Sequence, residues 1–190
     1  ARQVPQAAIL VDEAYFEFYG QTLLAQQRGI PNLFVARTFS KAYGLAGLRV
    51  GVLTGNAEHI SMVSKVSSPY NVNGVALACL PTALEDQDYV CQYVSQIRQG
   101  REELQREFAR WGVCYWPSQG NFVLASFGPL KTALIQSMRS RGILIRDRSR
   151  DYGCEGCVRI TLGTTEQTAR LLQALRETLA ELGVKEVIAK

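Results

Sequence analysis

The sequence predicts an α/β protein, in which short apolar strands lead into loops rich in glycine and alanine and are joined by helices. Residues 7–11 and 33–37 are short, mostly apolar runs, a pattern typical of strands buried in a parallel sheet. Residues 87–111 instead repeat apolar side chains near helical spacing, which predicts one long helix. Thr164 and Gln167 have the spacing of a capping box, so a final helix is expected to begin there.

Local signals predict the remaining elements. Asn56 and Asn73 are good N-caps, because an asparagine side chain accepts hydrogen bonds from the free amides of a first helical turn. Pro81 is expected to kink or shorten the helix that follows Asn73, and Gly100 to weaken the long helix near its middle. The sequence thus predicts helices over 21–28, 57–66, 74–84, 130–140 and 166–182, and strands over 49–53, 113–116, 122–127, 143–145 and 158–162.

Lys41 is the most informative residue of the chain. It lies in a loop of small residues between two apolar strand segments, 33–36 and 50–53. A lysine held at the end of a buried strand can lose hydration, lower its pKa and act as a nucleophilic amine, as Schiff-base chemistry requires. Spacing alone leaves a solvated loop charge as the alternative.

Polar side chains at the same strand ends match the needs of pyridoxal phosphate. This cofactor requires a carboxylate for its pyridine nitrogen, a donor for its 3-oxygen, an amine for its aldehyde and a hydroxyl with a forked cation for its phosphate. Ligands of open α/β sheets gather at the carboxyl ends of strands. In the order of those needs, the candidates are Asp12, Tyr15, Lys41, and Ser40 with Arg49. Taken singly, Asp12 is also compatible with a turn and Arg49 with a structural ion pair.

The runs DEAY at 12–15 and SKAYGLAGLR at 40–49 resemble the signature of fold-type I pyridoxal-phosphate aminotransferases, most closely the histidinol-phosphate aminotransferase branch. The resemblance extends from about residue 7 to residue 182. It implies Lys41 as the Schiff-base lysine, Asp12 as the pyridinium partner, Tyr15 on the 3-oxygen, and Ser40 and Arg49 on the phosphate.

The far end of the chain agrees with this resemblance. The runs GILIRD at 142–147 and CVRITLG at 157–163 are similar to the last two blocks of the family, whose substrate-carboxylate arginine corresponds to Arg159. A second arginine, Arg146, is assigned to the distal end of the substrate, a phosphate, and Asn121 matches a strand entry that lines the pocket. Independently, Arg159 lies in an apolar strand, where an unpaired guanidinium is costly, so a ligand carboxylate or a buried acid is expected as its partner.

The resemblance implies transamination of histidinol phosphate with 2-oxoglutarate in histidine biosynthesis, by a cytoplasmic homodimer whose partners are small molecules, an amino acid and a 2-oxo acid. Within the fold, an aromatic-amino-acid transaminase or a decarboxylase is an alternative. A catalytically incomplete fragment or a regulatory binding module is another. An unrelated thiol-redox protein using Cys154 and Cys157 is a third.

The family pattern begins upstream of residue 1, so we interpret the chain as the C-terminal portion of a longer enzyme. Residues 1–84 are expected to hold the last strands of the cofactor-binding large-domain sheet, with the Schiff-base lysine. Residues 85–111 would form a connecting helix, and residues 112–190 a small C-terminal α+β domain.

Composition argues against other classes of protein. Hydrophobic residues make up 47% and charged residues 20%, as in an ordinary globular protein. The net charge of +4 is dispersed, which disfavours nucleic acid as the main partner. No apolar run approaches a membrane span, and the first residues do not form a signal peptide. The five scattered cysteines favour reduced thiols, and with a single histidine, His59, no metal site is expected.

Overall fold

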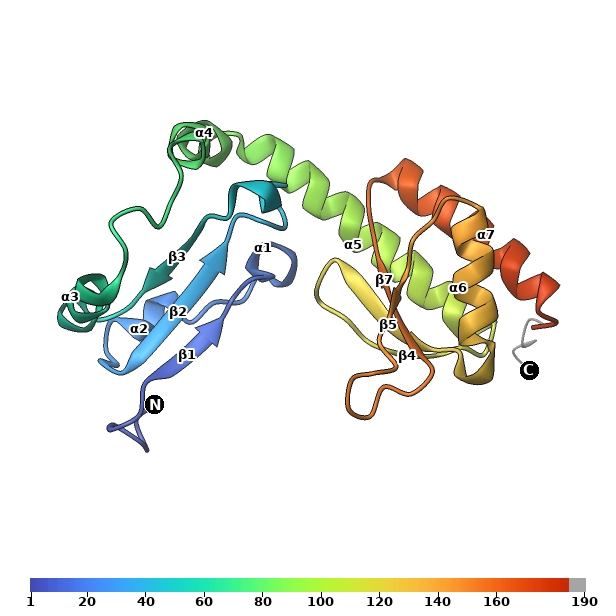
Figure 1. Cartoon of the computed structure of the whole chain (residues 1–190), viewed down its shortest axis with the longest axis horizontal. Helices are drawn as coiled ribbons and strands as arrows, with labels where there is room; N and C mark the ends of the chain where they lie inside the picture. Colours follow the sequence, from blue (N-terminus) through green and yellow to red (C-terminus); the bar gives the residue numbers. More distant parts are fainter. Residues whose placement is uncertain (185–190) are drawn as a thin grey trace. The chain divides into compact units, whose positions relative to one another are not determined.

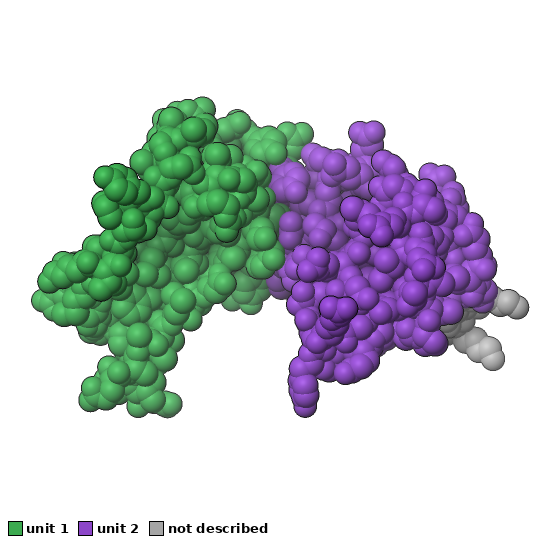
Figure 2. Space-filling model, viewed as in Figure 1, with its two compact units in different colours: residues 1–92 green, residues 93–190 purple. Residues whose placement is uncertain are grey.

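The computed structural model of the chain describes residues 1–184 and contains two compact units, the first formed by residues 1–92 and the second beginning at residue 93 (Figures 1 and 2). Helix α5 (Gln87–Arg110) belongs partly to each unit. The three-part division with boundaries at 84 and 111 stays a prediction, and residues 185–190, at the end of its last part, lie outside the described residues.

The first unit is built on a three-stranded sheet in the order β1-β2-β3. Strand β1 (Ile9–Asp12) runs parallel to β2 (Leu33–Thr38), and β2 runs antiparallel to β3 (Gly51–Thr54). Asp12 pairs with Ala36 and Thr38 with Gly51, so the carboxyl ends of β1 and β2 lie at one edge of the sheet. The predicted parallel pairing is therefore correct. It places Asp12, at the end of β1, beside the end of β2, which leads into the loop of Lys41.

Strand β1 is less buried than its apolar sequence predicts. Its residues alternate between partly buried and exposed, and Leu10 is 62% exposed. The buried positions are in β2, at Leu33 and Val35. Successive side chains of a strand point to opposite faces of the sheet, so the exposure of Leu10 means that the described residues leave its face of β1 uncovered.

Helices α1 (Phe16–Tyr19), α2 (Leu24–Gln27), α3 (Ala57–Val66) and α4 (Gly74–Glu85) complete the first unit. Asn56 and Asn73 cap α3 and α4 through their side chains, as predicted. Pro81 does not shorten α4, which continues past it to Glu85, and the alternative expectation of a kink stays a prediction.

The second unit has a four-stranded antiparallel sheet in the order β4-β5-β7-β6. Its strands are β4 (Cys114–Trp116), β5 (Phe122–Ser126), β6 (Arg146–Asp147) and β7 (Cys157–Thr161). Helices α6 (Lys131–Ser140) and α7 (Thr165–Glu181) lie side by side (Figure 1). The capping box of Thr164 and Gln167 is present at the start of α7, as predicted.

The core of this second unit is formed by buried side chains from its helices and its strands. Leu104, Leu134 and Leu175, one from each of α5, α6 and α7, are fully buried. Val123 of β5 and Ile160 of β7 are equally inaccessible. Buried side chains alternate along β5 and along β7 from Val158 onward, which is the pattern of an antiparallel sheet with one covered face.

The strand predicted over 143–145 is wrong, because pairing begins only at Arg146. Gly142 adopts a left-handed conformation, with φ of 73°, and the Ile143 amide bonds to the Met138 carbonyl at 2.9 Å. These residues therefore close the end of α6 instead of entering the sheet. The apolar character of residues 143–145 suggested a buried strand, but Leu144 is 79% exposed.

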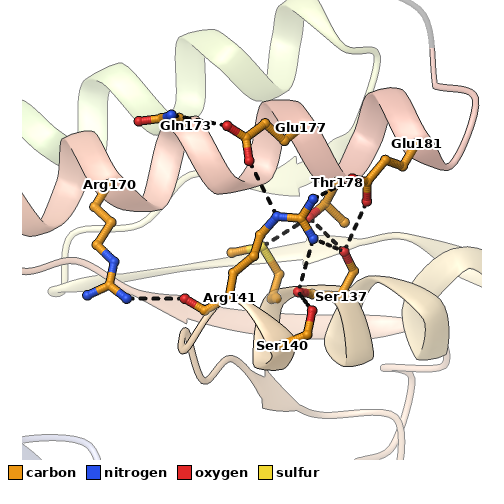
Figure 3. Close-up of polar contacts among 9 residues, drawn as sticks. Ser137, Ser140, Arg141, Arg170, Gln173, Glu177, Thr178 and Glu181 are labelled. Atoms are coloured by element: carbon orange, nitrogen blue, oxygen red, sulfur yellow. Dashed lines mark hydrogen bonds and ion pairs between the residues drawn. The ribbon is translucent and has the colours of Figure 1, made fainter.

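A polar layer joins the exposed sides of α6 and α7 (Figure 3). The Arg141 guanidinium bonds to Glu177, Glu181 and the Ser137 hydroxyl. Beneath it, the buried Thr178 hydroxyl lies 3.1 Å from the Ser137 hydroxyl. Because Arg141 and both glutamates are solvent-accessible, we attribute the stability of this helix pair mainly to the apolar core.

Candidate active site

The loop that carries Lys41 is closed by its own backbone. The Phe39 amide bonds to the Val50 carbonyl at 3.4 Å, and the Leu45 amide bonds to the Phe39 carbonyl at 3.0 Å. Phe39 and Val50 are buried, whereas Lys41 is partly exposed. The lysine is thus presented from a loop whose two ends are fixed in the core.

Helix α4 packs against this loop. Phe39, Val50 and the fully buried Ala76 form one hydrophobic cluster. Partly buried side chains from both the loop and the helix surround it: Tyr43, Leu45, Leu48, Val72 and Leu80. Apolar burial therefore positions the loop on the first turns of α4.

Lys41 and Tyr15 are brought together by the sheet. The Lys41 ammonium lies 5.8 Å from the centre of the Tyr15 ring, within the range of a cation–π contact. Asp12, at the end of β1, is exposed and accepts a hydrogen bond from the Ala14 amide at 2.9 Å. Asp12 thus forms the turn that its sequence position allows. It lies at the end of β1, next to the end of β2 from which the Lys41 loop begins.

The two predicted phosphate ligands lie at the two ends of the Lys41 loop. Ser40 follows β2, and Arg49 precedes β3. The Ser40 hydroxyl accepts a hydrogen bond from the Thr38 hydroxyl at 2.8 Å. Arg49 has φ of 55° and is the one non-glycine residue in the described part of the chain with positive φ. Its guanidinium donates to the Ala46 carbonyl at 2.9 Å. Strained conformations of this kind persist where the surroundings fix them, and they cluster at ligand-binding sites.

A buried carboxylate that sequence reasoning missed supports the Asp12 segment. Glu13 is 8% exposed and accepts hydrogen bonds from the Thr22 hydroxyl, the Leu23 amide and the Arg37 guanidinium. Burial alone would raise the pKa of Glu13, but these hydrogen bonds and the charge of Arg37 bring that pKa below its ordinary value. Arg37 also stacks 3.5 Å above the centre of the Phe16 ring. An acid next to the candidate Asp12 was visible in the sequence, but its distant partner was not.

Arg146 and Arg159 occupy opposed positions in neighbouring strands of the second unit, β6 and β7. The Nε atom of Arg159 is buried and has no hydrogen-bond partner within residues 1–184. The Arg159 guanidinium lies 5.3 Å from the centre of the Phe122 ring. No acid among residues 1–184 bonds to this atom, so an anionic ligand as the partner of Arg159 stays a prediction.

A basic groove of about 810 Å³ contains both arginines. Its two acids are already engaged, Asp147 by Lys131 at 2.8 Å and Asp151 by Arg148. The Lys131 ammonium and then the Ser149 amide hold the pKa of Asp147 far below its ordinary value. The lining residues are Ile135, Arg139, Ile143, Leu144, Ile145, Arg146, Asp147, Arg148, Arg150, Asp151, Arg159 and Thr161. This excess of guanidinium groups suits an anionic ligand.

The remaining predicted substrate residue, Asn121, precedes β5 and does not line this groove. Its carbonyl accepts a hydrogen bond from the Leu162 amide at 2.8 Å. The candidate cofactor residues thus belong to the first unit, and Asn121, Arg146 and Arg159 belong to the second.

The cysteines offer no support for thiol-redox chemistry. All five are free, and Cys157 is buried. Burial, and then the neighbouring Cys154 thiol, raise the pKa of Cys157, whereas a reactive cysteine needs a lowered one. Within the described residues, histidine, cysteine and acidic side chains form no group of three or more suited to a metal ion. None of the helices between residues 1 and 184 has the length and apolar character needed to cross a membrane.

Comparison with known proteins identifies close relatives over nearly the whole chain. Histidinol-phosphate aminotransferase 2 of Pseudomonas fluorescens (strain Pf0-1) is 36% identical over 187 residues, which cover 94% of this chain and 50% of the relative. Histidinol-phosphate aminotransferase of Thermoanaerobacter sp. (strain X514) is 39% identical over 182 residues, covering 93% of this chain and 50% of the relative. The chain therefore spans about half the length of the curated relatives it matches.

Solved structures give the same result for the fold. Histidinol-phosphate aminotransferase from Sinorhizobium meliloti, in complex with pyridoxal-5′-phosphate, has a TM-score of 0.82 and 29% identity over 94% of this chain and 50% of that chain. L-threonine-O-3-phosphate decarboxylase from Porphyromonas gingivalis has a TM-score of 0.81 and 26% identity over 94% of this chain and 57% of that one. These similarities confirm the predicted α/β class. A family model for aminotransferase class I and II matches residues 3–175, and the chain belongs to that family.

Proposed function

We propose that this chain is the part of a pyridoxal-phosphate aminotransferase that carries the reactive lysine and the substrate arginines. The whole protein would transfer the amino group of histidinol phosphate to 2-oxoglutarate. The observation that carries this proposal is the placement of Lys41 beside Tyr15, 5.8 Å from the ring centre, in a loop fixed next to the strand end that bears Asp12.

The residues of the first unit suit pyridoxal phosphate chemically. When bound, this cofactor supplies an electron sink for the charge left after the substrate loses an α-proton. Asp12 would hold the proton on the pyridine nitrogen, and Tyr15 would donate to the 3-oxygen. Ser40 and Arg49 would bind the phosphate, for which a hydroxyl and a forked cation are suited.

Lys41 would bind the cofactor aldehyde and, once displaced by the incoming amine, move the proton from the substrate α-carbon through its Nζ atom. Its setting supports this role, because the loop ends at Phe39 and Val50 are buried while the lysine itself stays accessible. A loop anchored at both ends with an accessible amine suits both binding and proton transfer.

The second unit supplies recognition of anionic substrates. The buried Nε of Arg159 lacks a hydrogen-bond partner among the described residues, so a carboxylate of 2-oxoglutarate would satisfy it. Arg146, opposite it in the sheet, would bind the phosphate of histidinol phosphate. Both groups are delocalised anions, which a guanidinium fork matches better than a lysine does.

Decarboxylation of a phosphorylated amino acid is the second candidate function. The observation in its favour is the similarity to L-threonine-O-3-phosphate decarboxylase, at a TM-score of 0.81 and 26% identity. The same arginines would then bind a phosphate and a carboxylate on one substrate. We favour transamination because the curated relatives are histidinol-phosphate aminotransferases at 36% and 39% identity.

The whole protein is further proposed to act as a cytoplasmic homodimer. The five cysteines of this chain are all free, as expected in a reducing compartment. Val66, the last residue of α3, and Tyr70, in the segment between α3 and α4, are 87% and 89% exposed, and exposed apolar side chains of this kind would suit burial against a partner.

Borohydride reduction in the presence of pyridoxal phosphate, followed by peptide mass spectrometry, tests the proposed role of Lys41. The expected result is a pyridoxyl adduct on Lys41, which is lost in Lys41→Ala and retained in Lys65→Ala, a control on the exposed surface of α3. Incubation with histidinol phosphate and 2-oxoglutarate should yield glutamate, whereas carbon dioxide released from O-phosphothreonine would favour the second candidate. An adduct distributed over several lysines would contradict the proposal.

A further inference from the structure

The N-cap residue of α4 makes hydrogen bonds to two separate segments. Its side-chain oxygen, Asn73 Oδ1, accepts from the Ala76 amide at 2.8 Å and so caps the helix. Its side-chain nitrogen, Nδ2, donates to the Leu48 carbonyl at 2.9 Å. A carbonyl can only accept and an amide N–H can only donate, so both bonds agree on one orientation of the Asn73 side chain.

The second bond acts on the peptide that precedes Arg49. Leu48 ends the short 3₁₀ turn η1 (Ala46–Leu48), and its carbonyl belongs to the peptide group shared with Arg49. Arg49 then adopts φ of 55°, which an L-residue with a long side chain rarely does. Holding the Leu48 carbonyl fixes the plane from which this unfavourable φ is measured.

Apolar packing reinforces the bond at the same place. Leu48 packs against the cluster of Phe39, Val50 and Ala76, and Ala76 is the residue whose amide Asn73 caps. The start of α4 thus holds the Arg49 segment through a side-chain hydrogen bond and through buried surface.

The other asparagine cap shows that this arrangement is not a general consequence of capping. Asn56 Oδ1 accepts from the Glu58 and His59 amides, at 2.9 and 3.4 Å, and both bonds stay within α3. Asn73 shares the capping bond with Asn56 and adds the link to a loop 25 residues away in the sequence.

We propose that Asn73 is a positioning residue for Arg49: its amide holds the Leu48–Arg49 peptide in the orientation that places the guanidinium for a phosphate group. The assignment of that phosphate to pyridoxal phosphate rests on the proposed function. The restraint itself is a property of the chain without any ligand.

Hydrogen exchange of the cofactor-free protein, read by mass spectrometry, tests the restraint. Asn73→Asp keeps an acceptor for the Ala76 amide but sets an oxygen against the Leu48 carbonyl. Asn73→Ser keeps a capping hydroxyl that is too short to reach the loop. Both should speed exchange at residues 45–50 by about fivefold, the effect of losing one ordinary hydrogen bond, while α4 stays protected. Asn56→Asp, the same change at the other cap, should leave residues 45–50 as in the unmodified protein.

Titration with pyridoxal phosphate provides the second readout. Affinity should fall by a similar factor of about five in both Asn73 variants and remain unchanged in Asn56→Asp. Unchanged exchange at residues 45–50 in both Asn73 variants would overturn the inference, as would faster exchange with full cofactor affinity. Failure of the unmodified protein to bind the cofactor would count against the proposed function. The exchange rates of the cofactor-free proteins would still decide whether Asn73 restrains residues 45–50.

Discussion

Arg146 and Arg159 stand directly opposite each other in the antiparallel pair of β6 and β7. Like charges at such positions repel, because the side chains of an opposed pair leave the sheet on the same face. Arg159 gains some compensation from the Phe122 ring, 5.3 Å from its guanidinium, but its Nε has no hydrogen-bond partner in the described residues. The chain thus keeps an unfavourable pair that an anion would relieve.

Arg146→Gln tests this relationship by removing one charge of the pair. Without ligand, the free energy of unfolding should rise by up to about 1 kcal/mol, because the repulsion is gone. Added inorganic phosphate should raise the Tm of the unmodified protein more than that of the variant. Arg106→Gln, on the exposed surface of α5, is the matched charge control and should respond like the unmodified protein. Equal phosphate responses in all three proteins would contradict the idea.

Glu13 should make stability depend on pH. Its folded-state pKa lies below the ordinary value of 4.5, so its contribution is present above about pH 4.5 and is lost as the pH falls towards the folded-state pKa. Glu13→Gln should cost about 2 kcal/mol at neutral pH, as expected for hydrogen bonds to a buried charge, and should flatten acid unfolding monitored by circular dichroism.

Glu85→Gln, at the exposed end of α4, controls for the loss of one carboxylate and should leave that acid profile unchanged. Glu107 acts in the same direction in the second unit, where burial opposes and hydrogen bonds from Arg176 and Arg110 lower its pKa. Part of the acid sensitivity should therefore survive in Glu13→Gln. A profile identical to that of the unmodified protein would show that folding does not lower the pKa of Glu13.

Gly100 should resist substitution in spite of its helical position. A Cβ there would lie 2.8 Å from the Thr168 hydroxyl oxygen, so α5 and α7 meet where only glycine fits. Gly100→Ala should destabilise by about 1–3 kcal/mol through overpacking, although alanine favours an isolated helix by about 1 kcal/mol. In a Thr168→Ala background the same change should be neutral or stabilising, as urea unfolding would measure. Equal costs in the two backgrounds would remove the steric explanation.

The sequence predicted best where the signal is local. The lysine run and the DEAY run are contiguous, and the caps at Asn56 and Asn73 need only the next few residues to be recognised. The parallel pairing of β1 with β2 followed from two apolar runs and is present in the structure. These elements are set by nearest neighbours and strand order, which a sequence states directly.

Contacts between distant segments could not be predicted in the same way. The Glu13–Arg37 pair joins residues 24 apart, and no local pattern selects Arg37 among the arginines as the partner. The link from Asn73 to Leu48 likewise looks in the sequence like a cap alone. Gly100 seemed a weakness of the long helix because the side chain it accommodates, Thr168, belongs to another helix.

Thiol reactivity should separate the cysteines by burial. Cys79, Cys91 and Cys114 are exposed and should react quickly with a disulfide reagent at neutral pH. Cys157 should react slowly, because burial, and then the adjacent Cys154 thiol, raise its pKa and limit the thiolate fraction. Peptide mapping after timed labelling checks this order. Fast reaction of Cys157, or a Cys154–Cys157 disulfide formed under mild oxidant, would revive the thiol-redox alternative.

Arg49→Asn separates the structural cost of this residue from its proposed use. Asparagine tolerates a positive φ better than arginine does, which offsets the lost hydrogen bond to the exposed Ala46 carbonyl. The free energy of unfolding should therefore stay within about 1 kcal/mol of the unmodified protein, while affinity for pyridoxal phosphate falls. Arg49→Lys retains the charge and the strain but loses the fork, and should bind the cofactor with intermediate affinity. If Arg49→Asn bound the cofactor as tightly as the unmodified protein, the left-handed arginine would have no role in phosphate recognition, and its unfavourable backbone would need another explanation.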